Sequence, residues 1–200
     1  MDNKYKNLHV VGIAGSLRRE SYNRQALKIA LRFAQEIGAQ VEEIDLNELN
    51  LPLYNEDITA NGFPDVVERM KNIVAHADVM LIASPEYNYS VPAPLKNALE
   101  WISRGKNVLD GKSAAIFGAS TGAFGTIRMQ PHLRQILEAL NVSFVSQPQV
   151  FIRFAAEAFA PDGSLKDKQV EGQLKMLIEK TFLLATVQNQ ERQAKSTYNN

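Results

Sequence analysis

The sequence contains no cysteine. This absence excludes disulfides, thiolate chemistry, zinc clusters built on cysteine and iron–sulfur centres held by cysteine. It also fits a reducing compartment, and we expect a cytoplasmic protein. Histidine is scarce as well. His9, His76 and His132 are scattered without the spacing of metal ligands, so the sequence predicts no metal site.

Net charge and long apolar runs are missing too. Lys plus Arg and Asp plus Glu both number 22, so no overall field draws the chain to nucleic acid or to a membrane surface. The apolar run at residues 8–14 is too short to cross a bilayer and lacks a convincing signal-cleavage pattern. We therefore expect no nucleic-acid partner and no membrane insertion, and any bound anion must be held by a local site.

Two common phosphate-binding motifs are absent. The dinucleotide pattern G-x-G-x-x-G is missing after the first apolar run, where the chain has Gly12 and then Gly15. A Walker motif also fails, because the segment 111–113 (Gly-Lys-Ser) has Lys106 at the position of the motif's first glycine and precedes a strand. A mononucleotide therefore fits the sequence better than a bound dinucleotide.

Buried strands and amphipathic helices are predicted to alternate along the chain. Buried apolar runs predict strands at 8–14, 78–84 and 113–118, and a weakly alternating run predicts one at 41–46. A fifth strand is predicted at 142–145, open to continuation at 150–151. Apolar residues at helical spacing predict helices at 22–37, 64–76, 94–103, 126–140 and 166–190. This alternation predicts one α/β domain over 1–190, with a five-stranded parallel sheet and helices on both faces. A polar, frayed tail is expected over 191–200.

Three irregular segments with unusual side chains, 15–23, 85–94 and 119–125, each follow a predicted strand. In open α/β sheets, ligands bind outside the carboxyl ends of the strands. We therefore expect the three segments to meet at one shared site.

The first segment joins a strand to the start of a helix. Helix starts attract anions, because their unpaired N–H groups and the helix dipole favour negative charge. Ser21 is a candidate helix cap, and Ser16, Arg18 and Asn23 are candidates to complete a cage for a terminal phosphate. A capped helix with solvated arginines is the alternative interpretation.

The other two segments offer different surfaces. Residues 85–94 hold three prolines, two tyrosines and Asn88, which suit the edge of a planar heterocycle or simply form a rigid surface turn. Residues 118–125 are small and hydroxylated, so they allow close approach of a ligand or form a flexible helix entry. For both segments the two interpretations stay open at the level of sequence.

In these segments the chain resembles the NADPH-dependent FMN reductase family, which includes quinone, azo-dye and chromate reductases. The matches are Gly15-Ser16-Leu17-Arg18 with Ser21 and Asn23, residues 85–92 with Leu95-Lys96-Asn97-Ala98 and Trp101, and Ser120, Gly122, Gly125 and Arg128 with residues 132–137. They span about residues 8–140, and Pro-Glu-Tyr-Asn is the most specific piece. Two departures, Gly125-Thr126 in place of paired glycines and the tighter step Ala93-Pro94, leave the acceptor preference open.

The resemblance implies a flavodoxin-like fold, noncovalently bound FMN and assembly into dimers or tetramers. It places Ser16, Arg18, Ser21 and Asn23 around the phosphate of FMN. It places Pro85, Glu86, Tyr87 and Asn88 along the isoalloxazine ring, mainly through backbone groups, with Ser120 and Gly122 beside the other edge.

The implied activity is hydride transfer from NAD(P)H to FMN and then to a small acceptor, such as a quinone, an azo compound, free flavin or chromate. No catalytic side chain is required, because the cofactor carries the chemistry. The alternatives are a flavodoxin-type electron carrier without its own substrate and a flavin-free regulatory or scaffold protein of the same fold. Hydrolysis is disfavoured, because no histidine has an evident serine partner.

Several further side chains have open roles. Trp101 is expected in the core or at an interface. The cations Arg104, Lys106, Arg128 and Arg134 are interpreted as solvated charges, as subunit contacts or as groups that attract the nucleotide phosphate.

Overall fold

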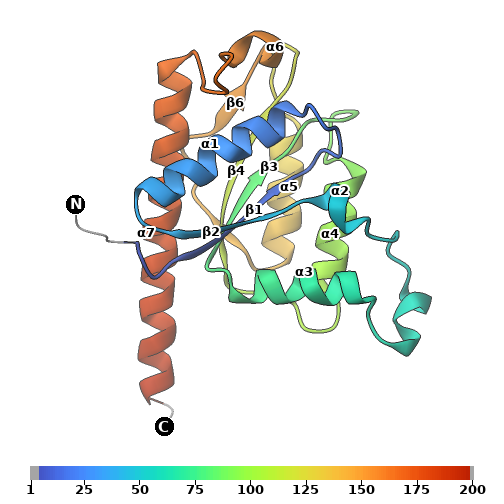
Figure 1. Ribbon diagram of the computed structural model, residues 1–200. Coiled ribbons are helices and arrows are strands. Elements are labelled where there is room, and N and C mark those ends of the chain that lie inside the picture. The colour runs from blue at the N-terminus through green and yellow to red at the C-terminus, as the bar shows by residue number, and fades with distance from the viewer. Residues whose placement is uncertain (1–4, 199–200) are drawn as a thin grey trace.

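A single parallel sheet forms the middle layer of the protein (Figure 1), which a computed structural model describes over residues 5–198. Its strands are β1 (His9–Ala14), β2 (Gln40–Ile44), β3 (Val79–Ala83), β4 (Ser113–Ala119), β5 (Ser143–Phe144) and β6 (Val150–Ile152). The order is β2-β1-β3-β4-β5, β6 also pairs with β4, and every pairing is parallel. This order confirms the predicted flavodoxin-like α/β fold.

Helices cover both faces of the sheet. They are α1 (Tyr22–Glu36), α2 (Leu46–Leu49), α3 (Asp65–His76), α4 (Ala93–Ser103), α5 (Met129–Ala139), α6 (Ala155–Ala158) and α7 (Lys168–Tyr198), with a 3-10 helix, η1 (Glu56–Asn61). Successive side chains of β3 point to opposite faces, so Leu81 packs in the core under α1 and α7 while Met80 and Ile82 pack under α3, α4 and α5. Two apolar layers therefore hold the strand ends in place, and Trp101 lies fully buried in the second.

The predicted fifth strand is split into two pieces. Ser143 in β5 pairs with Ser113 at the start of β4, and Val150 in β6 pairs with Phe117 near its end. Pro148 lies in the gap and has no N–H to donate to a ladder. The expected continuation at 150–151 is confirmed.

Side chains of α5 bind carbonyl groups on both sides of this gap. Arg134 Nη1 donates to Val145 O at 3.1 Å, and Gln130 Nε2 donates to Val150 O at 2.8 Å. The interruption in the strand is therefore compensated by polar side chains of the neighbouring helix.

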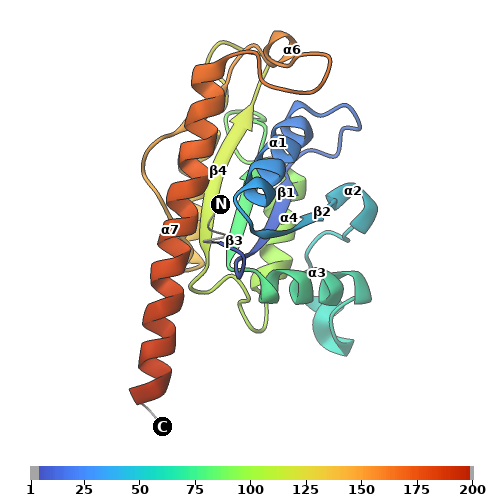
Figure 2. The ribbon, with the colours of Figure 1, turned by 60° about the vertical axis from the view of Figure 1, so that its left-hand side comes forward.

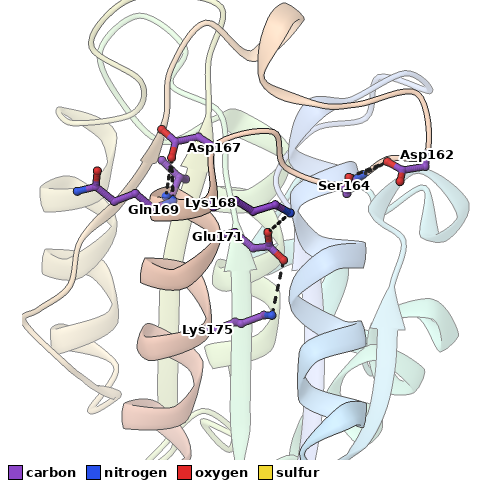
Figure 3. A network of polar contacts seen from close by, with 8 residues as sticks. Asp162, Ser164, Asp167, Lys168, Gln169, Glu171 and Lys175 are labelled. Carbon is purple, nitrogen blue, oxygen red and sulfur yellow. Dashed lines mark hydrogen bonds and ion pairs between the residues drawn. The ribbon is translucent and has the colours of Figure 1, made fainter.

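The start of α7 is fixed by polar side chains (Figure 3). Asp167 Oδ1 accepts from the backbone N–H groups of Gln169 (2.8 Å) and Val170 (3.2 Å), as a helix cap does. Glu171 pairs with Lys168 at 2.7 Å and with Lys175 at 3.6 Å. These contacts place the first turn two residues later than predicted.

The other end of α7 differs from the prediction. The helix continues to Tyr198, so residues 191–198 are helical rather than frayed. Figure 2 shows α7 running alongside β4 and projecting beyond the sheet. Gln188 accepts from Ser113 Oγ and donates to Ser143 Oγ, both at 2.7 Å, and Asn189 donates to Asp78 at 2.8 Å. These polar side chains dock the helix on the amino ends of the strands. The helix continues beyond them through residues whose polar composition had indicated a tail.

The short elements α2, η1 and α6 were not predicted. Each spans four to six residues, fewer than a periodic pattern needs. Within residues 5–198, no helix combines the length and apolar character needed to cross a membrane.

Candidate functional site

The three irregular segments meet at the carboxyl ends of β1, β3 and β4, at the upper end of the sheet in Figure 1. Ser16 Oγ, after β1, lies 3.4 Å from the hydroxyl of Tyr87, after β3. Asn23 Nδ2 donates to Ala119 O at 2.9 Å, and Ala119 N donates to Asn23 Oδ1 at 2.8 Å. The expected convergence of the segments is therefore confirmed.

A hollow of about 180 Å³ lies between these segments. Its walls are Ser16, Arg18, Ser21, Tyr22, Asn23, Pro85, Glu86, Tyr87, Ala119, Ser120 and Thr121. All the predicted site residues line it except Asn88 and Gly122. Asn88 lines an adjoining hollow with Glu86 and Tyr89. Gly122 lies in the same loop as Ser120, whose hydroxyl accepts from Gly122 N at 3.2 Å.

The segment after β1 supplies hydroxyl and guanidinium donors. Ser21 caps α1, since its Oγ accepts from Asn23 N at 3.2 Å and Arg24 N at 3.4 Å. Those two amides are therefore already bound and do not face an anion. Ser16 is buried, and the exposed Arg18 lies 5.3 Å from the ring of Tyr22. An anion in the hollow would meet the hydroxyl groups and Arg18 rather than these first-turn amides.

Asn23 holds the site together. Its side chain is 3% exposed, and both its oxygen and its nitrogen bind the backbone of Ala119. The prediction placed this amide in a phosphate cage. In the structure Asn23 lines the hollow and its amide group also binds Ala119 at the end of β4. Asn23 therefore fixes the distance between the start of α1 and the end of β4.

Glu86 caps α5 from the loop after β3. Its Oε2 accepts from Arg128 N (2.8 Å) and Met129 N (3.0 Å), and its Oε1 accepts from Arg128 Nε (2.8 Å). Burial raises the pKa of Glu86, but the hydrogen bonds and charge of Arg128 with the Met129 amide outweigh burial, and the net pKa lies below its usual value. The carboxylate is thus ionised and fully engaged, which argues against a role as a general base.

Substituting Glu86→Gln tests this cap. We expect the free energy of unfolding at neutral pH to fall by about 1–3 kcal/mol, because charge-assisted bonds to a helix start are lost. A folded-state pKa below the unfolded value gives stability that is present above about pH 4.3 and lost as pH falls through the folded pKa. Urea unfolding of both proteins from pH 7 to pH 3 should show the difference narrowing. A constant difference, or none at neutral pH, would contradict this account.

The loop after β3 ends in a two-residue turn. Ser90 N donates to Tyr87 O at 2.9 Å, and Tyr87 N donates to Ser90 O at 3.1 Å. The two central residues have positive φ, 48° for Asn88 and 66° for Tyr89. Asparagine tolerates this conformation, but for a bulky residue it is rare. The guanidinium of Arg128 lies 3.9 Å from the centroid of the Tyr89 ring and supports it.

One departure from the family pattern has a structural explanation. Thr126 is fully buried and packs against Gly118, where an added Cβ would lie 2.7 Å from Thr126 Oγ1. The threonine thus fills space behind the strand rather than at the mouth of the hollow.

A larger hollow of about 570 Å³ lies between β6, α6 and the start of α7, lined in part by Phe151, Arg153 and Lys166. None of the predicted site residues borders it. We favour the smaller hollow as the functional site, because polar groups from three strand ends converge there.

The histidines have separate surroundings. His132 Nδ1 lies 3.0 Å from Ser90 Oγ, and His76 Nδ1 lies 2.8 Å from Asn72 O. Among the residues the structure describes, no three side chains of the metal-ligating types gather in one place.

The sheet order and the polar hollow beyond its carboxyl edge define a flavodoxin-like α/β protein. The sequence profile of the family described as NADPH-dependent FMN reductase matches residues 8–157. The chain belongs to that family, as its motifs indicated.

Individual relatives agree over most of the chain. An NAD(P)H-dependent FMN reductase of Pseudomonas aeruginosa is 47% identical over 80% of this chain and 86% of its own length. An NAD(P)H:quinone oxidoreductase of Solanum tuberosum is 40% identical over 86% of this chain and 89% of its own. The structure of FerB, a flavoenzyme NAD(P)H:(acceptor) oxidoreductase of Paracoccus denitrificans, aligns with a TM-score of 0.81 at 32% identity, covering 90% of this chain and 98% of FerB.

Proposed function

We propose that this protein is an FMN-dependent NAD(P)H oxidoreductase that reduces quinones and similar small acceptors. The observation that carries the proposal is the hollow in which hydroxyl and guanidinium donors converge from three strand ends. Family membership and the names of the relatives, which include FMN and quinone reductases, support the same activity.

The donor chemistry of the hollow suits the phosphorylated end of FMN, bound noncovalently. Ser16, Ser21 and Arg18 offer hydroxyl and guanidinium groups, and the one carboxylate in the wall, Glu86, is neutralised by Arg128. At about 180 Å³ the hollow is smaller than the roughly 300–1,000 Å³ of pockets that enclose a whole ligand. We therefore assign the phosphate and its chain to this hollow, and the ring to the open surface beside it.

Each predicted residue then has a role. Ser16, Arg18 and Ser21 hold the phosphate, while Asn23 keeps α1 and β4 at the right separation. Backbone groups of residues 85–88 and of Ser120 and Gly122 border the ring. All of these residues belong to the one FMN-binding domain that we propose over residues 1–190, and residues 191–200 are its polar extension.

When bound, FMN supplies the hydride-transfer chemistry. The chain holds FMN in place and positions the nucleotide and the acceptor beside it. NAD(P)H and the acceptor use the same open surface in turn, which is a ping-pong order. No side-chain acid or base is assigned, because Glu86 is held ionised by Arg128 and the start of α5.

We also propose that the chain assembles into a dimer or tetramer. Leu53, Leu183 and Val187 are large apolar side chains with 44–78% of their surface exposed. Association would bury such surface.

Steady-state turnover separates the enzyme from a flavodoxin-type carrier. Purified protein loaded with FMN should oxidise NADPH continuously when a benzoquinone is supplied, and the rate should depend on the bound FMN. A flavodoxin-type carrier would need a separate reductase to oxidise the nucleotide. If neither NADPH nor NADH supports turnover, the proposal is contradicted.

A further inference from the structure

We propose that Arg128, which lies against the rings of Tyr89 and Phe124, binds a phosphate group of the nicotinamide nucleotide. This inference rests on the proposed function. The sequence left four cations, Arg104, Lys106, Arg128 and Arg134, as candidates to attract that phosphate. The structure distinguishes Arg128 from the other three.

Three of the four are occupied elsewhere or distant from the site. Arg134 donates to Val145 O at 3.1 Å and lies 4.8 Å from the ring of Phe144, so it is committed to the gap in the fifth strand. Arg104 and Lys106 follow the carboxyl end of α4, whereas the loop that borders the hollow precedes its amino end. The length of α4 puts them about 16 Å from that end.

Arg128 binds Glu86, which lines the hollow, and the orientation of the Arg128 side chain is fixed. Its Nε donates to Glu86 Oε1 at 2.8 Å, and its guanidinium lies 3.9 Å from the ring centroid of Tyr89 and 5.4 Å from that of Phe124. Its side chain is nevertheless 42% exposed. Among the described residues, none accepts a hydrogen bond from its Nη1 or Nη2.

A guanidinium held in this way is suited to an anion. The carboxylate of Glu86 fixes one edge of the planar group and leaves the remaining N–H donors in the fork arrangement that matches phosphate oxygens. The negative charge of Glu86 does not oppose an incoming anion strongly, because its side chain is 6% exposed and also binds two backbone amides.

The surroundings of Arg128 indicate a nucleotide rather than a free inorganic anion. Tyr87, Tyr89, Phe124 and Phe154, all 49–65% exposed, lie on the loops that follow β3, β4 and β6. Tyr89 presents its ring from a left-handed conformation, which is strained for a bulky residue, at a turn position where glycine is usual. Exposed rings beside a guanidinium recognise a flat base together with its phosphate. A quinone has the flat ring but no phosphate, so Arg128 would distinguish the hydride donor from the acceptor.

The variant Arg128→Gln tests this assignment in the FMN-loaded protein. We expect the KM for the nucleotides to rise about tenfold, the effect of losing one charge-assisted hydrogen bond. At saturating FMN, the kcat/KM for 1-benzyl-1,4-dihydronicotinamide, a hydride donor without phosphate, should fall clearly less than the kcat/KM for the nucleotides. A rise for NADPH alone assigns the 2′-phosphate, and an equal rise for NADPH and NADH assigns the pyrophosphate. Arg69→Gln, an exposed arginine on α3, is the matched control.

Binding provides a second measurement that does not depend on turnover. Calorimetric titration of the FMN-loaded protein with NADP⁺ should show about tenfold weaker binding for Arg128→Gln than for wild type. Tyr89→Gly removes the ring and relieves the left-handed strain, so it should keep the fold and also weaken NADP⁺ binding.

Two results would overturn the assignment. One is an unchanged affinity of Arg128→Gln for both nucleotides, and the other is an equal loss with the phosphate-free donor. If the wild-type protein oxidises NADPH and Arg128→Gln gives either result, only this inference is removed. A wild-type protein that fails to oxidise NADPH would remove the proposed function itself.

Discussion

Gly118→Ala is expected to lower the free energy of unfolding by about 3 kcal/mol or more, the upper end of the usual cost of overpacking. Gly118 lies near the carboxyl end of β4, where an added Cβ would stand 2.2 Å from the backbone oxygen of Ser84. That oxygen belongs to the backbone at the end of β3 and has no freedom to rotate away. The strand ends would have to separate, and the hollow between them would change shape.

Thermal unfolding is the direct measurement for Gly118→Ala. A loss of 3 kcal/mol corresponds to a fall in Tm of roughly 6–12 °C for a chain of this length. The control is Gly172→Ala in α7, where an added Cβ meets nothing within 4 Å. That variant should gain about 0.5–1 kcal/mol, because alanine favours the helix. Equal Tm values for Gly118→Ala and wild type would contradict the close approach of β3 and β4.

The double variant Ser16→Ala/Arg18→Gln is expected to bind FMN at least about tenfold more weakly than wild type. It removes a hydroxyl and a guanidinium from the wall of the hollow. Riboflavin has the same ring but no phosphate, so its affinity should be similar in both proteins. Fluorescence titration with each flavin measures this difference. Equal FMN affinity in the two proteins would place the phosphate elsewhere.

Elements whose apolar pattern extends over many residues could be predicted from the sequence. The run 78–84 and the helical spacing over 22–37 gave β3 and α1 almost to the residue. The start of α5 was placed three residues early, at 126 rather than Met129. That helix is capped by Glu86, 42 residues before Arg128, and local periodicity carries no trace of such a partner.

The location of the site was predictable for a related reason. Parallel strands bring their carboxyl ends to one edge, so the loops after β1, β3 and β4 had to meet. The partners of single side chains were not predictable. Asn23 binds Ala119, which lies 96 residues further along the chain. Arg128 lies against the ring of Tyr89, and Tyr89 has a left-handed backbone conformation in which glycine is expected. Such contacts depend on how the loops fold against one another.

The most direct test of the proposed function is an anaerobic half-reaction in a stopped-flow spectrophotometer. Protein carrying FMN is mixed with NADPH, and the flavin absorbance near its visible maximum is followed. The account predicts bleaching of the protein-bound flavin, followed by full recovery of the colour when a benzoquinone is added. A flavin that stays oxidised in the presence of excess NADPH and NADH would contradict it.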